Sequence, residues 1–126
     1  MSEDLIGIVQ SAYAQIGTSE TEIGDEIQDG YTRYIYSIIM MSDDGSEQNI
    51  EIFNGDSANK ERHTVAKLRV ADATDGKTQI GGDINSPIMI IRPDTTNTEN
   101  SYQANKIYMK AQTSTVNVLI SYYDKP

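Results

Sequence analysis

The chain has 126 residues and carries 19 acidic residues against 10 Lys and Arg, a formal net charge of −9. This length predicts one domain with a single core, and so acidic a chain lacks the Lys- and Arg-rich surface that free nucleic acid requires. The sequence contains no cysteine, which excludes disulfides, thiolate nucleophiles and cysteine-based zinc sites.

The first segment, residues 2–16, fits two interpretations. Apolar residues share one face at helical spacing, which favours a short helix; they are Leu5, Ile8, Val9, Ala12 and Ile16. Gly7 weakens such a helix, and the other interpretation is an extended arm that reaches across a neighbouring copy. In either case we expect the segment to lie outside the main sandwich. The chain then divides into an N-terminal arm or short helix over residues 1–18 and a single β-domain over residues 19–126.

Strand signals follow in chain order. Residues 20–28 predict a short edge strand, because Ile23 and Ile27 stand among charged and polar residues that discourage edge-to-edge pairing. Residues 31–42 form the most apolar stretch and are rich in aromatic and β-branched side chains, which predicts a central strand buried on both faces. We expect residues 48–54 to return beside it as the second strand of a hairpin.

Polar segments rich in turn residues separate the next strands. Residues 65–71 alternate between apolar and charged side chains and predict a strand with one buried face. Residues 87–92 predict another strand, whose leading proline suits the first strand position or a sheet edge. Residues 93–104 are polar and predict an exposed loop.

The last stretch, residues 106–123, predicts two strands joined by a tight polar turn at residues 112–114. Strict alternation indicates one buried face, because successive side chains of a strand point to opposite sides of the sheet. The residues expected to face inward are Ile107, Met109, Ala111, Val116, Val118, Ile120 and Tyr122. We expect the two strands to pair as a hairpin.

Together these signals predict an all-β fold, an antiparallel, jelly-roll-like β-sandwich of about seven or eight strands. Strands do not alternate with helices, so a parallel sheet is not expected. No apolar run approaches membrane-spanning length, and residues 1–4 are acidic where a secretory signal would be basic. We therefore expect a protein that is made in a cytoplasm and has no membrane partner.

Candidate catalytic and metal-binding residues are few. The single histidine, His63, has no Ser, Cys or Asp partner at a catalytic spacing, so we expect neither an enzyme nor a cofactor; a small hydrolase would need this histidine in a cleft beside acids. Calcium is the better-motivated ligand, since it takes about six to eight oxygens from carboxylates and carbonyls. The calcium candidates lie in two acidic turns and are Asp43, Asp44, Asp72 and Asp75. The default interpretation of both turns is a solvated turn without metal.

Tyrosine is the dominant aromatic residue, with eight copies against one Phe and no Trp. An alternative function is therefore a carbohydrate- or ligand-binding module, calcium-dependent in one form, with tyrosine rings as stacking faces. Such modules usually use tryptophan, however, and tyrosine is also favoured at protein interfaces.

The order of segments carries a resemblance. The segments are the Thr-, Ser- and Glu-rich lead at residues 16–23, the turn at Gly30, and the strands at residues 34–42, 49–53, 87–90, 106–111 and 116–123. This order resembles the small β-sandwich virion proteins of tailed bacteriophages and related archaeal viruses, such as head-decoration and head- or tail-accessory proteins. The chain departs from the family at residues 28–29, where Gln-Asp stands in place of a proline.

The resemblance implies a non-enzymatic structural protein that is located in the virion and decorates a capsid. Its implied partners are copies of itself, with a trimer as the first expectation, and the major capsid protein or another virion protein. We expect the N-terminal segment to become ordered on contact with such a partner. The residues expected at interfaces are Leu5, Ile8, Val9, Tyr13, Tyr31 and Tyr123.

Overall fold

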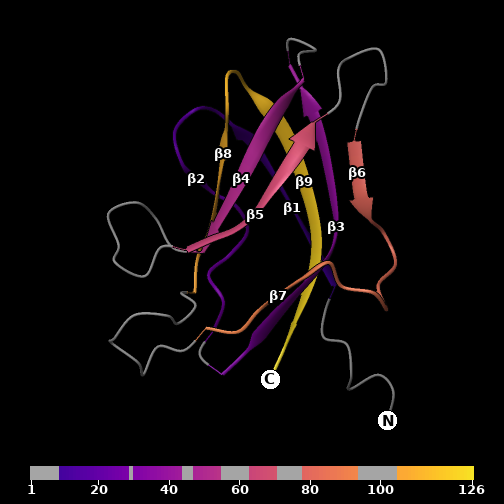
Figure 1. The fold of residues 1–126 in the computed structure, drawn as a ribbon. Coiled ribbons are helices and arrows are strands. Elements are labelled where there is room, and N and C mark those ends of the chain that lie inside the picture. Colours follow the sequence, from indigo (N-terminus) through magenta and orange to yellow (C-terminus); the bar gives the residue numbers. More distant parts are fainter. Residues whose placement is uncertain (1–8, 29, 44–46, 55–62, 71–77, 94–104) are drawn as a thin grey trace.

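The computed structural model describes residues 9–28, 30–43, 47–54, 63–70, 78–93 and 105–126. These residues form two antiparallel β-sheets that pack face to face (Figure 1), and none of them forms a helix, so none forms a membrane-spanning helix. The strands are β1 (Val9–Ile16), β2 (Thr21–Glu22), β3 (Thr32–Ser42), β4 (Gln48–Asn54), β5 (His63–Val70), β6 (Thr78–Gly81), β7 (Met89–Ile91), β8 (Ile107–Ala111) and β9 (Val116–Lys125). The predicted all-β sandwich is confirmed, with nine described strands in place of the expected seven or eight.

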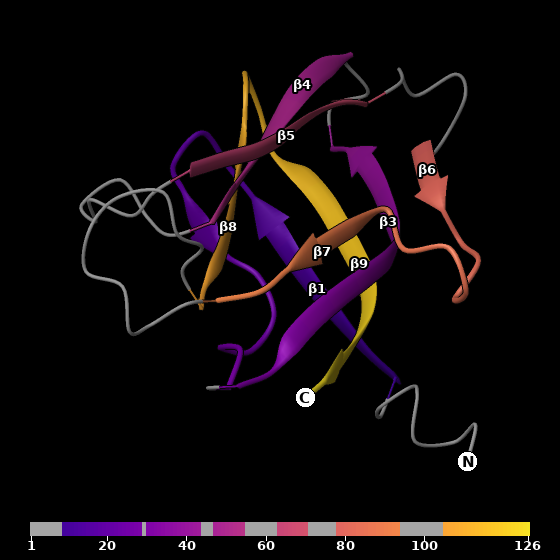
Figure 2. The same cartoon turned by 60° about the horizontal axis from the view of Figure 1, so that its bottom comes forward.

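The strands are arranged in the order of a jelly roll. The five-stranded sheet has the order β1-β9-β3-β6, with β7 also paired to β3, and the four-stranded sheet has the order β2-β8-β4-β5. The antiparallel pairs are nested, since β1 pairs with β9, β2 with β8, β3 with β6 and β4 with β5. The chain is thus one long antiparallel ribbon folded over into two layers. In Figure 2, β4 and β5 lie in one layer, and β3 and β9 lie in the other.

The inner faces of the two sheets form the core. The inward side chains of β8 and β9 are each at most 2% exposed, as the alternation predicted; they are Ile107, Met109, Ala111, Val116, Val118, Ile120 and Tyr122. From β3, Ile35, Ile38 and Met40 meet them between the sheets. Each large apolar side chain buried in this way contributes about 1.5–3 kcal/mol to folding.

Both predicted hairpins are wrong. β3 lies in the five-stranded sheet and β4 in the four-stranded sheet, and β8 and β9 are separated in the same way. A hairpin and a connection between facing sheets have the same sequence pattern, because in both cases each strand has one buried face and a polar turn joins the two strands. Alternation therefore identified the strands without identifying their partners.

Residues 9–16 form neither a helix nor an arm outside the sandwich, which corrects that part of the prediction. They are β1, which pairs with β9 along its whole length and buries Ile16 completely. A strand satisfies its backbone hydrogen bonds through this pairing, whereas an isolated short helix is marginal in water. Residues 1–8, which include Leu5 and Ile8, lie outside the described residues.

The other strand predictions have mixed outcomes. The short edge strand is confirmed as β2, and Ile23 and Ile27 after it are buried. β3 is central as predicted, but it is not buried on both faces, since the outward Met41 is 46% exposed. β6 was not predicted, because Ile80 is its only large apolar residue.

The side-chain amide of Gln48 links the strands at one end of the sandwich by hydrogen bonds. Its Oε1 accepts hydrogen bonds from the backbone N–H groups of Thr113 and Ser114 at 3.0 and 3.1 Å. Its Nε2 donates to the hydroxyl oxygens of Ser42 and Ser114 at 2.7 and 2.8 Å. One fully buried side chain of β4 thereby joins the end of β3 to the turn that precedes β9.

A buried ion pair links β3 to β9 at the other end of the sandwich. Nε and Nη2 of Arg33 each donate to one carboxylate oxygen of Asp124 at 2.8 Å, and Nη1 donates to the carbonyl of Asp25 at 2.7 Å. The guanidinium also lies 4.0 Å from the centre of the Tyr122 ring. The Arg33 side chain is 1% exposed, so nearly all of its charge is balanced from within the protein.

Candidate functional site

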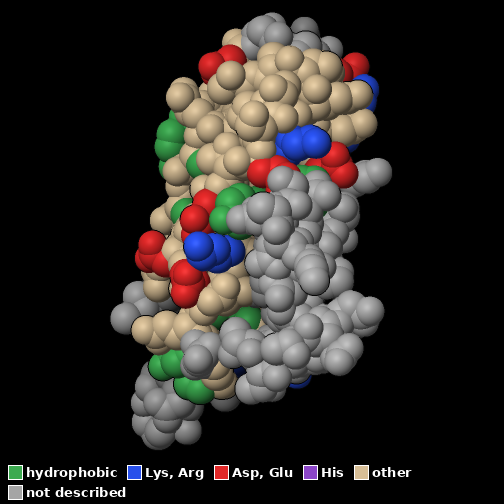
Figure 3. All heavy atoms as spheres, turned by 90° about the vertical axis from the view of Figure 1, so that its left-hand side faces the viewer, with side chains coloured by type: hydrophobic (Ala, Val, Ile, Leu, Met, Phe, Trp, Pro, Cys, Tyr) green, Lys and Arg blue, Asp and Glu red, His purple; other side chains and the backbone are tan. Residues whose placement is uncertain are grey.

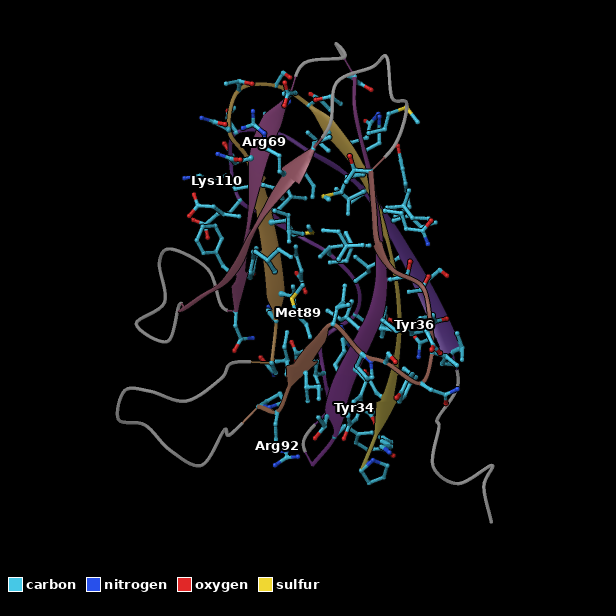
Figure 4. The ribbon with its side chains drawn as sticks, turned by 45° about the vertical axis from the view of Figure 1, so that its right-hand side comes forward. Tyr34, Tyr36, Arg69, Met89, Arg92 and Lys110 are labelled. Carbon is cyan, nitrogen blue, oxygen red and sulfur yellow. The ribbon has the colours of Figure 1, made fainter. Side chains whose placement is uncertain are left out.

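The two outer faces of the sandwich differ in chemistry. Figure 4 shows Arg69 and Lys110 on the side of the four-stranded sheet, and Tyr34 and Tyr36 on the side of the five-stranded sheet. Their strands belong to the corresponding sheets. We call the outward side of β1, β9, β3, β6 and β7 the tyrosine face, and its residues are given below by register row.

Four rows of outward side chains cross the tyrosine face. The first row is Val9, Tyr123, Tyr34 and Ile90; the second is Ser11, Ser121, Ser37 and Gly81; the third is Tyr13, Leu119, Ile39 and Gln79; the fourth is Gln15, Asn117 and Met41. No residue in these rows carries a charge. The second row consists of small residues, so the molecular surface is lower along this row than along the first and third rows, which are largely apolar.

The large hydrophobic side chains that are most exposed among the described residues lie on this face. The described large hydrophobic side chains with high exposure are Val9, Tyr13, Met41 and Ile90, at 46–62%, and all four belong to the tyrosine face. No described strand packs over this face. A face that gathers the exposed large apolar side chains in this way is a candidate interaction site.

Stacked tyrosines occupy one corner of the face. The rings of Tyr34 and Tyr123 stack with centroids 5.1 Å apart and planes 10° apart, and Tyr36 lies 6.3 Å from Tyr123. Nζ of Lys125 lies 5.0 Å from the centre of the Tyr34 ring. These contacts hold three aromatic rings in fixed positions, and rigid rings lose little conformational entropy when a partner binds.

A bulge in β3 sets which residues reach this face. The pairing of β3 with β9 shifts register between Ile35 and Ser37, so Tyr36 has no partner on β9. Its carbonyl instead accepts a hydrogen bond from the N–H of Gly82 at 2.7 Å. A bulge changes the alternation of a strand, so Tyr34 lies outward before it and Ile39 lies outward after it.

The environment of Tyr123 makes the stability of the folded protein depend on pH. Burial raises the pKa of its hydroxyl above the ordinary value of 10.0, and the neighbouring Tyr34 raises it further. The folded protein then keeps this proton to a higher pH than the unfolded chain. The resulting stabilisation is complete below about pH 10 and is lost as the pH rises further.

We therefore expect the free energy of unfolding to fall above about pH 10, and to fall less steeply in a Tyr123→Phe variant. Urea unfolding of both proteins between about pH 8 and about pH 11 measures the two slopes. Equal slopes would show that Tyr123 ionises alike in the folded and unfolded states.

The outer face of the four-stranded sheet is polar and charged. Figure 3 views the molecule from the side of β2 and β8, and acidic and basic side chains lie next to one another there. A hollow of about 340 Å³ on this face is lined by Thr18, Asn49, Glu51, Lys110, Ala111 and Gln112. This lining offers no nucleophile paired with a base, so it supplies no chemistry for covalent catalysis.

A second hollow, of about 470 Å³, lies at the Arg33 end of the sandwich. Tyr31 lines it together with Asp25 and Glu26. Arg33 also reaches this hollow, but its guanidinium is engaged by Asp124 and by a backbone carbonyl. The arginine therefore has a structural role, and none of the described residues that line the hollow offers a free cation to an anion.

The structure places the predicted interface residues in different surroundings. Val9 and Tyr13 are exposed on the tyrosine face, and Tyr123 is on the same face but only 5% exposed. Tyr31 is half-buried against the core beside the second hollow. The face brings three of the six predicted residues together, and Leu5 and Ile8 lie outside the described residues.

The other candidate residues yield no site. Asp43 is exposed, and its carboxylate accepts a hydrogen bond from Asn117, while Asp44, Asp72 and Asp75 lie outside the described residues. Within the described ranges, no cluster of three or more His, Cys, Asp or Glu could hold a metal ion. His63 is the first residue of β5, and at this position the structure describes only the backbone.

Five apolar residues of the four rows were not among the predicted interface residues. The sequence signal for them is an apolar side chain at an outward position of a strand with one buried face; they are Tyr34, Ile39, Met41, Ile90 and Leu119. Comparison of the sequence with models of protein families and with curated proteins finds no match in either case.

Proposed function

We propose that the protein is a non-enzymatic structural protein of a virion, a decoration or accessory component that binds the viral shell and associates with copies of itself. In this proposal it is made in the host cytoplasm and acts in the virion. The tyrosine face carries the proposal, because its four rows offer a binding surface with neither a charged residue nor a catalytic group among them. The viral setting rests on the resemblance of the segment order.

The composition of the tyrosine face supports a protein partner. Interface centres are depleted of charged residues and enriched in Tyr and Met, and this face has Tyr13, Tyr34, Tyr36 and Met41 with no charge in its four rows. The rest of an acidic molecule keeps packed copies soluble. A partner centred on the four rows would bury mainly uncharged surface, and the Lys125 ammonium group lies at the Tyr34 corner of the face.

The jelly-roll arrangement agrees with the proposal by analogy. Viral capsid proteins share this architecture, and so do lectin domains, so the fold alone does not choose between them. The carbohydrate-binding alternative is favoured by one observation, the 62% exposure of Tyr13. Specific glycan binding that is lost in a Tyr13→Ala variant would support that alternative.

The direct test adds charge to the tyrosine face. In an Ile90→Glu/Met41→Glu variant we expect binding to shells assembled from the major capsid protein of the same genome to weaken by at least about tenfold, because a buried unpaired carboxylate costs more than about 1.4 kcal/mol. Cosedimentation with the shells measures the affinity, and circular dichroism checks the fold.

The matched control is Thr18→Glu/Gln28→Glu, which adds the same charge at exposed positions away from the tyrosine face. We expect it to bind shells like the wild type. Equal weakening in both variants would mean that only net charge matters. Wild-type protein that does not bind the shells would contradict the proposed function.

A further inference from the structure

β1 is an edge strand with one free side. It is the terminal strand of its sheet and pairs with β9 alone. No other described strand pairs with its second side. Every second residue of this eight-residue strand therefore presents its backbone N–H and C=O groups along this edge, and unpaired edges of this kind are templates for another strand.

β1 lacks the usual protection of an edge. Its sequence VQSAYAQI has no charge, no proline and no glycine, whereas exposed edges are normally short, charged or interrupted. The other described edges follow that rule, since β2, β6 and β7 have only two to four residues and β5 contains Lys67 and Arg69. β1 is the one long uncharged edge among the described strands.

The long side chains of β1 lean away from its free side. The hydroxyl of Tyr13 donates to Oδ1 of Asn117 on β9 at 2.6 Å. Oε1 of Gln10 accepts a hydrogen bond from the Tyr122 hydroxyl, also on β9, at 3.1 Å. The other side chains in the middle of β1 are those of one serine and two alanines, so no bulky side chain of β1 itself shields the edge.

A second copy of this chain fits the edge better than a different partner. Two molecules of charge −9 repel each other. Pairing through β1 limits this repulsion, because it brings two uncharged edges together. The two strands have equal length, and an antiparallel pair places outward residues opposite outward residues. The rows of the tyrosine face would then continue from one copy into the next.

We propose that β1 pairs antiparallel with β1 of a second copy about a two-fold axis perpendicular to the sheet, joining two five-stranded sheets into one. This deepens the proposed function, because it gives the self-association a surface and a symmetry. The axis runs between the two strands, midway between one residue of β1 and the same residue of the other copy, since a register centred between two residues would place an inward side chain opposite an outward one.

Single cysteines test this geometry in a chain that has none of its own. The variants are Ser11→Cys, Ala12→Cys, Tyr13→Cys and Ala14→Cys. The residue nearest the axis faces its own copy with Cα atoms about 4.5–5.5 Å apart, which is within the range that a disulfide bridges. We expect mild oxidation to crosslink one of the four variants roughly tenfold more than the other three, because a shift of one or two residues moves the sulfurs out of reach.

The matched control is Ser121→Cys, which lies opposite Ser11 on β9, one strand in from the edge. We expect it to remain uncrosslinked, and sedimentation to show a dimer of the unmodified protein. Efficient crosslinking at Ser121, a monomer at all concentrations, or a trimer without crosslinking in β1 would each overturn the edge pairing. Binding of the protein to shells is measured separately, so the proposed function can stand if the edge pairing fails.

Discussion

An Asp124→Ala variant is expected to lose about 3–5 kcal/mol of stability, because removing one partner of a buried ion pair leaves the other charge uncompensated. The Arg33 side chain is 1% exposed where it lines the second hollow, so its charge would be poorly solvated in the variant. Its bond to the Asp25 carbonyl and its contact with the Tyr122 ring remain in the variant, but neither balances its charge. The midpoint of urea unfolding measures the loss.

Two further variants separate the ion pair from other effects. Glu47→Ala removes a carboxylate that pairs with Arg69 at 3.2 Å, and both of those side chains are more than half exposed, so we expect a loss within about 1 kcal/mol. Arg33→Met/Asp124→Ala removes both charges and should be more stable than Asp124→Ala alone. A double variant less stable than Asp124→Ala would show that the guanidinium is stabilised without its partner.

The second large effect is expected at Gly81, the last residue of β6. Its φ of +78° lies in the left-handed region, and an added Cβ would overlap the Tyr36 carbonyl oxygen. In Gly81→Ala, backbone strain and the forced movement of the β3 bulge should together cost about 2–4 kcal/mol. Thermal and urea unfolding measure this loss.

Two other glycines provide graded controls. Gly30 has a φ of +82° with nothing near an added Cβ, so Gly30→Ala should cost only the strain of about 1–2 kcal/mol. Gly17 has neither a left-handed φ nor a close neighbour, and Gly17→Ala should be neutral or stabilising by up to about 1 kcal/mol. Equal losses at Gly81 and Gly30 would show that the Tyr36 carbonyl moves aside freely.

The sequence predicted the strands of this protein well and their partners poorly. Alternation in residues 107–111 and 116–122 is strict, because inward positions are large and apolar. The same alternation is compatible with a hairpin or with a connection between facing sheets, since it reports burial and not hydrogen bonding. Only long-range pairing distinguishes the two, and a sequence shows no direct sign of it.

β1 shows a second limit of structure prediction from this sequence. Its inward residues include Gln10, Ala12 and Ala14, which contrast little in polarity with the outward residues. Together with Leu5 and Ile8, the apolar residues of this segment also match a helical period. The strand is formed because β9 offers it a complete partner, and that is a property of the tertiary structure.

The candidate site could be predicted in part. Val9, Tyr13 and Tyr123 were expected at an interface, and all three lie on the tyrosine face. The face as a whole could not be predicted, because its rows combine residues from strands far apart in sequence and depend on the bulge at Tyr36. The buried partnership of Arg33 with Asp124, separated by 91 positions, was equally hidden.

The nested pairing of strands constrains the order in which the protein is able to fold. β1 finds its partner only in β9, more than a hundred residues later, so a growing chain cannot complete the five-stranded sheet until that last strand has been synthesised. Closing such a loop is entropically costly, and folds dominated by distant contacts form slowly. Until β9 has been synthesised, both sides of the uncharged β1 are unpaired. During this time β1 is able to pair with the β1 strands of other nascent chains on the same mRNA.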